Sequence, residues 1–320
     1  MLKKVKKNYL YNYFNNQSEV VLLSVANYLV LLFGARILDT RQLGIYSLIY
    51  SLYLLCIGMY ISCIGETMFI KRNNNLSIKK QPLNEILSIV FIVLITIASI
   101  SSFLFIRFNA SYLNILIYSF SIVNLILFTN NRYFNLSNGR NKESFIKVII
   151  FFVLTISLIA FIFFLKIQIN SGYILFLLLG IPSFLINIIS INQINFKITN
   201  SHNFLWENKK FIFSSFKLQF IIWCSGHLHW LIIGSVVSID LIGIVRACLS
   251  LVNPVFSIGR GMTIFFLKLL SKDNSFKVLI YTSIISFVIS LSFILIWIIF
   301  PNQILELTIG IKYIEYKKVI

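Results

Sequence analysis

Residues 242–270 of this chain read IGIVRACLSLVNPVFSIGRGMTIFFLKLL, a hydrophobic run long enough to cross a bilayer. Polar side chains nevertheless recur within it at intervals of 4, 3, 4 and 3 residues, at Arg246, Ser250, Asn253, Ser257 and Arg260. Because a helix turns by about 100° per residue, these five positions form one polar stripe on an otherwise apolar helix. The two arginines lie about 21 Å apart along its axis, which is most of the hydrocarbon thickness.

The stripe has two interpretations. An arginine in the middle of a membrane span costs about 2.5 to 3.5 kcal/mol, so neither arginine is expected to face lipid there. Serine and asparagine could bond this helix to a neighbour while the arginines reach the two membrane interfaces. Alternatively, the stripe lines a water-filled transport path. We favour the path, because helix packing rarely requires two permanent cations along one helix.

The composition of the whole chain indicates a membrane protein. Of its 320 residues, 58% are hydrophobic and only 12% are charged, and the mean hydropathy is +0.88, which is too apolar for a soluble domain. The net charge of +18 resides mostly in short loops, so we read it as membrane topology and expect no nucleic-acid partner. Four cysteines without metal-ligand or redox spacing are predicted to be free thiols: Cys56, Cys63, Cys224 and Cys248.

Nine segments are long and apolar enough to span a bilayer, so the predicted fold class is an all-α polytopic membrane protein. Most Lys and Arg residues, including Arg132 after the fourth segment, lie in loops on one side, which predicts a cytoplasmic N-terminus. No loop exceeds about twenty residues, so none can hold a separate catalytic domain. The predicted spans are residues 20–38, 44–70, 86–106, 112–129, 145–165, 173–192, 211–237, 242–270 and 278–300.

An internal repeat appears when the chain is laid on itself with an offset of 199 residues. LGI at residues 43–45 then matches IGI at residues 242–244, and spans seven to nine fall near spans one to three. The repeat predicts a six-helix lobe at residues 1–200 and an incomplete second lobe at residues 201–320, with the ligand path between them. Span two carries a stripe of small residues suited to close helix packing: Ser47, Ser51, Gly58, Ser62 and Gly65.

Two short motifs resemble those of a known transporter family. GARIL at residues 34–38, followed by LGIYSL at residues 43–48, resembles the first hairpin of the polysaccharide transporters in the multidrug/oligosaccharidyl-lipid/polysaccharide exporter superfamily. IGIVRA at residues 242–247 resembles the run that opens their eighth helix. The span layout is also similar, most closely to the O-antigen repeat-unit flippases (Wzx type). Compared with them the chain is expected to be C-terminally short, since residue 320 corresponds to residue 121 in the repeat.

The resemblance implies that the chain flips undecaprenyl-pyrophosphate-linked oligosaccharides across the bacterial inner membrane for surface polysaccharide biosynthesis. The implied partners are the lipid-linked oligosaccharide and membrane lipids, with a polysaccharide polymerase and chain-length proteins as further candidates. No cofactor, metal or enzymatic step is expected. Arginine is suited to this substrate, because its planar fork of donors matches a pyrophosphate and stays protonated in a partly dehydrated cavity.

Three further residues are candidates for the site. Arg36 ends the first span, where it either contacts substrate or, as we favour, snorkels to the interface. Glu66 either pairs with a nearby basic residue such as Lys71 or couples transport to a proton or cation. His227 is either structural or a substrate contact.

Other functions remain as alternatives. A drug/cation antiporter of the same fold would favour buried carboxylates, and only Glu66 fits. A membrane-embedded repeat-unit polymerase would be an enzyme, but such enzymes generally show a long external loop that this chain lacks. A third alternative is a non-transporting remnant or assembly partner. We therefore predict a transporter and no enzymatic activity.

Overall fold

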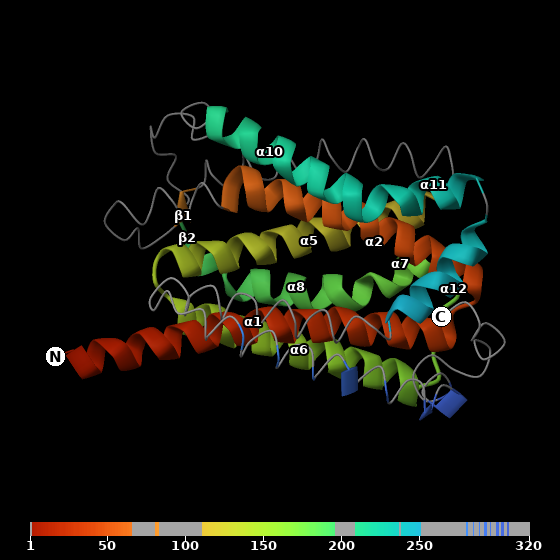
Figure 1. The fold of residues 1–320 in the computed structure, drawn as a ribbon, viewed down its shortest axis with the longest axis horizontal. Coiled ribbons are helices and arrows are strands. Elements are labelled where there is room, and N and C mark those ends of the chain that lie inside the picture. Colours follow the sequence, from red (N-terminus) through yellow and green to blue (C-terminus); the bar gives the residue numbers. More distant parts are fainter. Residues whose placement is uncertain are drawn as a thin grey trace.

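The computed structural model describes residues 2–65, 81–82, 111–195, 209–236 and 238–250, together with isolated positions between residues 280 and 306. Within these ranges the chain is a bundle of long helices that run roughly lengthwise beside one another (Figure 1). A two-residue parallel bridge between β1 (Gln81–Pro82) and β2 (Ile194–Asn195) is the only other regular pairing in the described part. The all-α prediction is therefore confirmed for the described residues.

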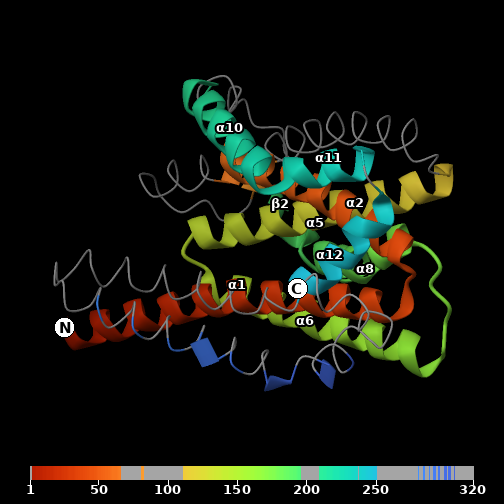
Figure 2. The same cartoon turned by 45° about the vertical axis from the view of Figure 1, so that its right-hand side comes forward.

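Some of the described helices follow one another through short connections, for example at residues 38–39 and 138–140 (Figure 1, Figure 2). Asp39 and Ser111 begin two of them by accepting a hydrogen bond from a backbone N–H in the first turn, which satisfies a donor that the helix leaves open. The helices are α1 (Leu2–Ile37), α2 (Thr40–Tyr60) with a π-helical end η1 (Ile61–Gly65), α5 (Tyr112–Ser137), α6 (Asn141–Phe164), α7 (Gly172–Leu175), α8 (Leu177–Ile189) with the 3-10 turn η2 (Ile191–Gln193), α10 (Lys209–Trp223), a π-helical segment η3 (Cys224–Leu228), α11 (His229–Val236) and α12 (Ile239–Ser250).

Five helical stretches in the described part are long and apolar enough to cross a membrane. They are Ser18–Ile37 within α1, then α2, α5, α6 and the stretch Gly172–Ile189. This confirms several apolar helices, whereas the predicted number of nine stays a prediction. The predicted span at residues 86–106 lies outside the described residues, as do residues 251–270 of the predicted span at residues 242–270. The predicted span at residues 278–300 is described only at isolated positions. The predicted end of the fourth span at residue 129 is wrong, because α5 continues to Ser137.

The helices matched by the 199-residue offset pack directly against each other. Within the described residues, α2 begins at Thr40 and α12 at Ile239, positions that differ by 199. The residue before each helix caps it in the same way. Asp39 accepts a bond from the Gln42 backbone N–H (2.6 Å), and Ser238 Oγ accepts one from the backbone N–H of the residue three positions on (3.1 Å). Sequence and local structure therefore repeat together at these two helix starts.

The contact between these helix starts is reciprocal, and we call it the α2–α12 crossing. A Cβ atom added to Gly44 would collide with the Ile239 carbonyl oxygen, and one added to Gly243 would collide with the Thr40 carbonyl oxygen. Gly44 of α2 thus touches Ile239, the first residue of α12, and Gly243 of α12 touches Thr40, the first residue of α2. Thr40 Oγ1 also donates a 2.9 Å hydrogen bond to Asp240 Oδ1. The crossing therefore has approximate two-fold symmetry, because each of the two copies of the motif uses the same surface to contact the other copy.

The small-residue stripe predicted on span two is buried throughout, which confirms that it serves close packing. The Ser51 carbonyl oxygen accepts a 2.8 Å hydrogen bond from Trp223 Nε1 of α10. Gly58 lies against the Gln219 side chain, and Gly65 lies against the ring of Tyr133. Small residues let neighbouring backbones approach in a membrane, where water does not drive helices together.

A network of asparagines joins α5 to α8. Asn131 Nδ2 donates to Asn187 Oδ1 (2.9 Å), and Asn187 Nδ2 donates to the Asn124 carbonyl oxygen (2.9 Å). Amide side chains in a lipid-embedded bundle need partners on neighbouring helices, because the hydrocarbon offers none. The network therefore fixes the register of α8 on α5.

Replacing Asn187 with leucine is expected to destabilise the fold by about 1 to 3 kcal/mol, because the substitution leaves Asn131 buried without its acceptor. The loss should appear as a lower midpoint temperature for unfolding of the purified protein in detergent. Asn114→Leu, the same substitution in the first turn of α5, is the control and should leave the midpoint nearly unchanged. Equal midpoints for the two variants would contradict the role given to the network.

Candidate functional site

Arg246 is the one residue of the predicted polar stripe whose side chain the structure describes. It is half-buried on α12, and its guanidinium carbon lies 5.5 Å from the ring centroid of Tyr50 on α2. Its Nε atom is buried and has no hydrogen-bond acceptor among the described residues. An arginine held by an aromatic face but without an anionic partner has donors available for a ligand or for water.

The Tyr50 ring belongs to an aromatic cluster at the centre of the bundle. It stacks on Tyr46 (centroids 6.0 Å apart) and contacts Tyr53 (5.7 Å) and Phe176 (6.2 Å). The Tyr46 hydroxyl is buried without a hydrogen-bond partner in the described part of the chain. Tyr46 Oη and Arg246 Nε, two polar atoms without partners among the described residues, therefore belong to residues that both contact the Tyr50 ring. Such orphan groups are rare in native interiors and mark places that water or a ligand can satisfy.

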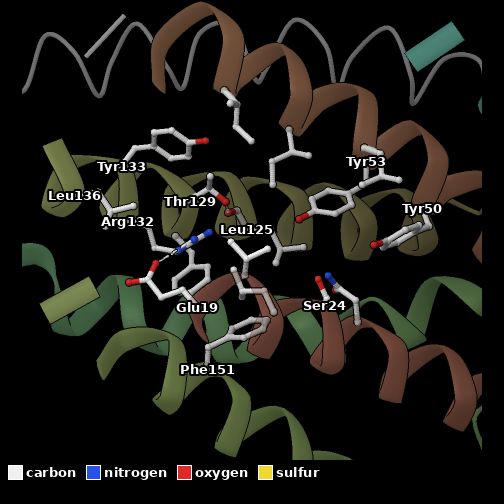
Figure 3. A pocket seen from close by; sticks show the side chains of 17 residues that line it. Glu19, Ser24, Tyr50, Tyr53, Leu125, Thr129, Arg132, Tyr133, Leu136 and Phe151 are labelled. Carbon is white, nitrogen blue, oxygen red and sulfur yellow. Dashed lines mark hydrogen bonds and ion pairs between the residues drawn. The ribbon is translucent and has the colours of Figure 1, made fainter. Parts of the chain in front are cut away.

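Tyr50 also lines a cavity of about 440 Å³ between α1, α2, α5 and α6. Figure 3 shows the cavity with Tyr50 and Tyr53 near one end and Arg132 near the other. Polar side chains of α1 and α5 also line it, among them Ser24, Asn27 and Thr129. The lining thus combines tyrosine rings with small hydrogen-bonding groups. Sugars require this combination, because they present both apolar C–H faces and hydroxyls.

An ion pair occupies the end of the cavity nearest the α5–α6 turn. Arg132 Nη2 of α5 donates to Glu19 Oε2 of α1 at 3.1 Å, and Arg132 Nε reaches the same oxygen at 3.4 Å (Figure 3). The side chain of Glu19 is fully buried and that of Arg132 is 12% exposed. A pair of full charges inside a membrane bundle is expensive and usually functional.

The sequence reasoning missed this pair. It placed Arg132 in a loop, because hydropathy falls near residue 129, and it began the first span at residue 20. The structure instead continues α5 past Arg132 and buries Glu19 inside the bundle. A signal was present in the sequence, since Thr129, Arg132 and Leu136 follow a helical spacing that continues the apolar face.

Arg36 and His227 lie apart from the cavity. Arg36 is exposed and lines a separate apolar groove of about 510 Å³ between α1 and α6, as an interfacial arginine would. His227 lies in the π-helical segment η3, where its ring packs against Trp223 at 6.3 Å between centroids. The structure therefore does not bring these two predicted residues together with Arg246.

The other predicted site residues are not described. Asn253, Ser257, Arg260 and Glu66 lie outside the described residues, and Ser250 is described as the last residue of α12 without its side chain. Cys56, Cys224 and Cys248 are free thiols, as predicted, while the Cys63 side chain is not described. Among the described ranges, no group of three His, Cys, Asp or Glu residues could hold a metal ion.

No known family model, curated protein or solved structure matches this chain. The resemblance to flippases therefore stays a prediction, and the chemistry has to be argued from the site itself. The described site offers Arg132 at one end of a cavity lined with tyrosines, and Arg246, which has no anionic partner among the described residues, against the ring of Tyr50, one of the lining residues. This arrangement suits a ligand that carries both an anionic group and sugar hydroxyls.

Proposed function

We propose that this protein is a transporter that flips undecaprenyl-pyrophosphate-linked oligosaccharide repeat units across the bacterial inner membrane. The observation that carries the proposal is Arg246, whose buried Nε has no acceptor among the described residues and whose guanidinium lies against Tyr50, a residue that lines the cavity. An unpaired cation inside a membrane bundle is tolerated when water or an anion reaches it. A pyrophosphate is such an anion and can accept two parallel hydrogen bonds from the guanidinium fork.

The proposed passage places the pyrophosphate at Arg246 and the saccharide in the cavity beyond Tyr50. Tyrosine faces would stack on the sugar rings, while Ser24, Asn27 and Thr129 would exchange hydrogen bonds with their hydroxyls. The proposed orientation puts the N-terminus in the cytoplasm, so the α5–α6 turn also lies on the cytoplasmic side. The second lobe, beginning near residue 201, would supply the other wall of the path through α12.

The proposal is tested by complementation of a bacterial strain that lacks its own repeat-unit flippase. We expect the chain to restore surface glycan, and we expect Arg246→Ala to lower the restored amount by at least about tenfold, since charge-assisted hydrogen bonds contribute about 1.5 to 3 kcal/mol. Arg246→Lys should retain part of the function, because it keeps the charge and loses the planar fork.

Arg41→Ala is the matched control, because Arg41 is exposed in the first turn of α2 and lies outside the cavity. It should restore as much glycan as the parent chain at equal expression. Equal restoration by the parent, Arg246→Ala and Arg41→Ala would remove Arg246 from the mechanism. A parent chain that inserts into the membrane yet restores no glycan would contradict the proposed function.

A further inference from the structure

The ion pair between Glu19 and Arg132 is one-sided. The two Arg132 nitrogens that donate to Glu19, Nε and Nη2, are directed at the same carboxylate oxygen, Oε2. The other oxygen, Oε1, is buried without a hydrogen bond in the described part of the chain. A structural arginine–carboxylate pair is commonly bidentate, with two parallel bonds to two oxygens. This pair therefore leaves hydrogen-bonding capacity unused on the carboxylate.

Apolar contacts lie beside the pair at the cavity. Phe128 of α5 stacks on Phe151 of α6 with centroids 4.9 Å apart and joins these two helices, whereas the ion pair joins α1 to α5. A buried ion pair is often no more stable than an apolar pair of similar volume, because desolvation offsets the attraction. Two charges kept at the wall of a cavity therefore call for an explanation other than packing.

Glu19 has an alternative partner if Arg132 releases it. The Ser144 hydroxyl of α6 lies beside Glu19, and like Glu19 Oε1 it is buried without a hydrogen bond of good geometry. A serine hydroxyl can donate to a carboxylate, because its proton rotates to suit the acceptor. Arg132 can thus exchange its partner without leaving a buried carboxylate wholly unsatisfied.

We infer that Arg132 is a second anion-binding group of the path and that Glu19 is its internal counter-ion, displaced when the diphosphate of the substrate arrives. The inference rests on the proposed function and extends it to the α5–α6 end of the cavity. A diphosphate competes well for arginine, because it carries more charge than a carboxylate and offers several acceptor oxygens to the same fork. Like-charge repulsion prevents Arg132 from holding both anions at once.

The exchange gives each arginine a different task. Arg132, at the end that we propose to be cytoplasmic, would receive the anion, and Glu19 would return to it once the anion has moved toward Arg246. The returning carboxylate lowers the affinity at the entry position, so the anion is not trapped there. Glu19 thereby acts as a positioning residue for release, and it does not need to touch the substrate.

The inference is tested with Glu19→Gln, which keeps the shape of the side chain and removes the competing charge. Binding of inorganic pyrophosphate to the purified full chain in detergent, measured by calorimetry, should become about tenfold tighter or more. Glycan transport by the same variant should fall, because the anion is released more slowly. Glu19→Gln combined with Arg132→Gln should lose the added affinity.

Glu143→Gln is the matched control, because Glu143 pairs with Arg140 at 3.9 Å on the surface and its side chain is 50% exposed. This variant should bind pyrophosphate as the parent does. An unchanged affinity in Glu19→Gln, or an equal gain in Glu143→Gln, would overturn the inference. Tighter pyrophosphate binding by Glu19→Gln in a parent chain that transports no glycan would support the counter-ion and contradict the proposed function.

Discussion

Replacing Gly243 with valine is expected to prevent the normal packing of α12 on α2. The first side-chain carbon would collide with the carbonyl oxygen of Thr40, which is backbone and cannot rotate away. Overpacking in a tight core typically costs about 1 to 3 kcal/mol, and a collision with helix backbone belongs at or above the upper end of that range. We expect a large drop in the yield of monodisperse protein and in the midpoint temperature for unfolding in detergent.

The reciprocal geometry of the α2–α12 crossing makes a second expectation possible. Gly44→Val should be as damaging as Gly243→Val, because Gly44 faces the Ile239 carbonyl oxygen in the same way. The double variant should cost less than the sum of the two, since separating the helices for one valine also makes room for the other. Strict additivity would indicate that the two glycines act at independent contacts.

Gly226→Val is the control for a glycine of the same chain. Gly226 is exposed in η3, and a Cβ atom added there meets no atom within 4 Å. Its substitution should shift the unfolding midpoint only slightly. Similar losses for Gly226→Val and Gly243→Val would refute the close α2–α12 crossing.

Sequence reasoning located the α2–α12 crossing in part. The offset of 199 residues aligned Gly44 with Gly243, and the structure shows that their helices start at equivalent positions and carry equivalent caps. The pattern could not show that the helices of the aligned glycines pack on each other. Hydrophobic periodicity defines the faces of one helix, but it does not show which other helix packs against a face. Contact between the aligned motifs is a property of the packed bundle.

The candidate site could be predicted less well, for a related reason. Hydropathy counts every charged residue against a membrane span, so Arg132 was assigned to a loop and the first span was started after Glu19. Their charges are tolerated because each is the partner of the other, and a single-helix measure cannot detect pairing between α1 and α5. Arg246 was found because its polar neighbours share its helix face. The Tyr50 ring beneath it comes from a different helix.

Replacing Arg132 with methionine is expected to be among the most damaging single changes in this bundle. The substitution leaves Glu19, whose side chain is fully buried, without its counter-ion. Removing one partner of a buried ion pair typically costs about 3 to 5 kcal/mol, because an uncompensated charge stays in the interior. The loss should appear as a strongly lowered unfolding midpoint in detergent, well below that of Arg41→Met at the exposed start of α2.

The double variant Glu19→Leu with Arg132→Met separates stability from function. Two apolar side chains of similar volume remove both charges and their desolvation, so most of the lost stability should return. A pair kept for packing alone would leave glycan transport intact in the stable double variant. We expect instead a well-folded protein that transports poorly, because the anion-binding group and its internal counter-ion are both missing. A stable double variant with full transport would show that the charges serve only the fold.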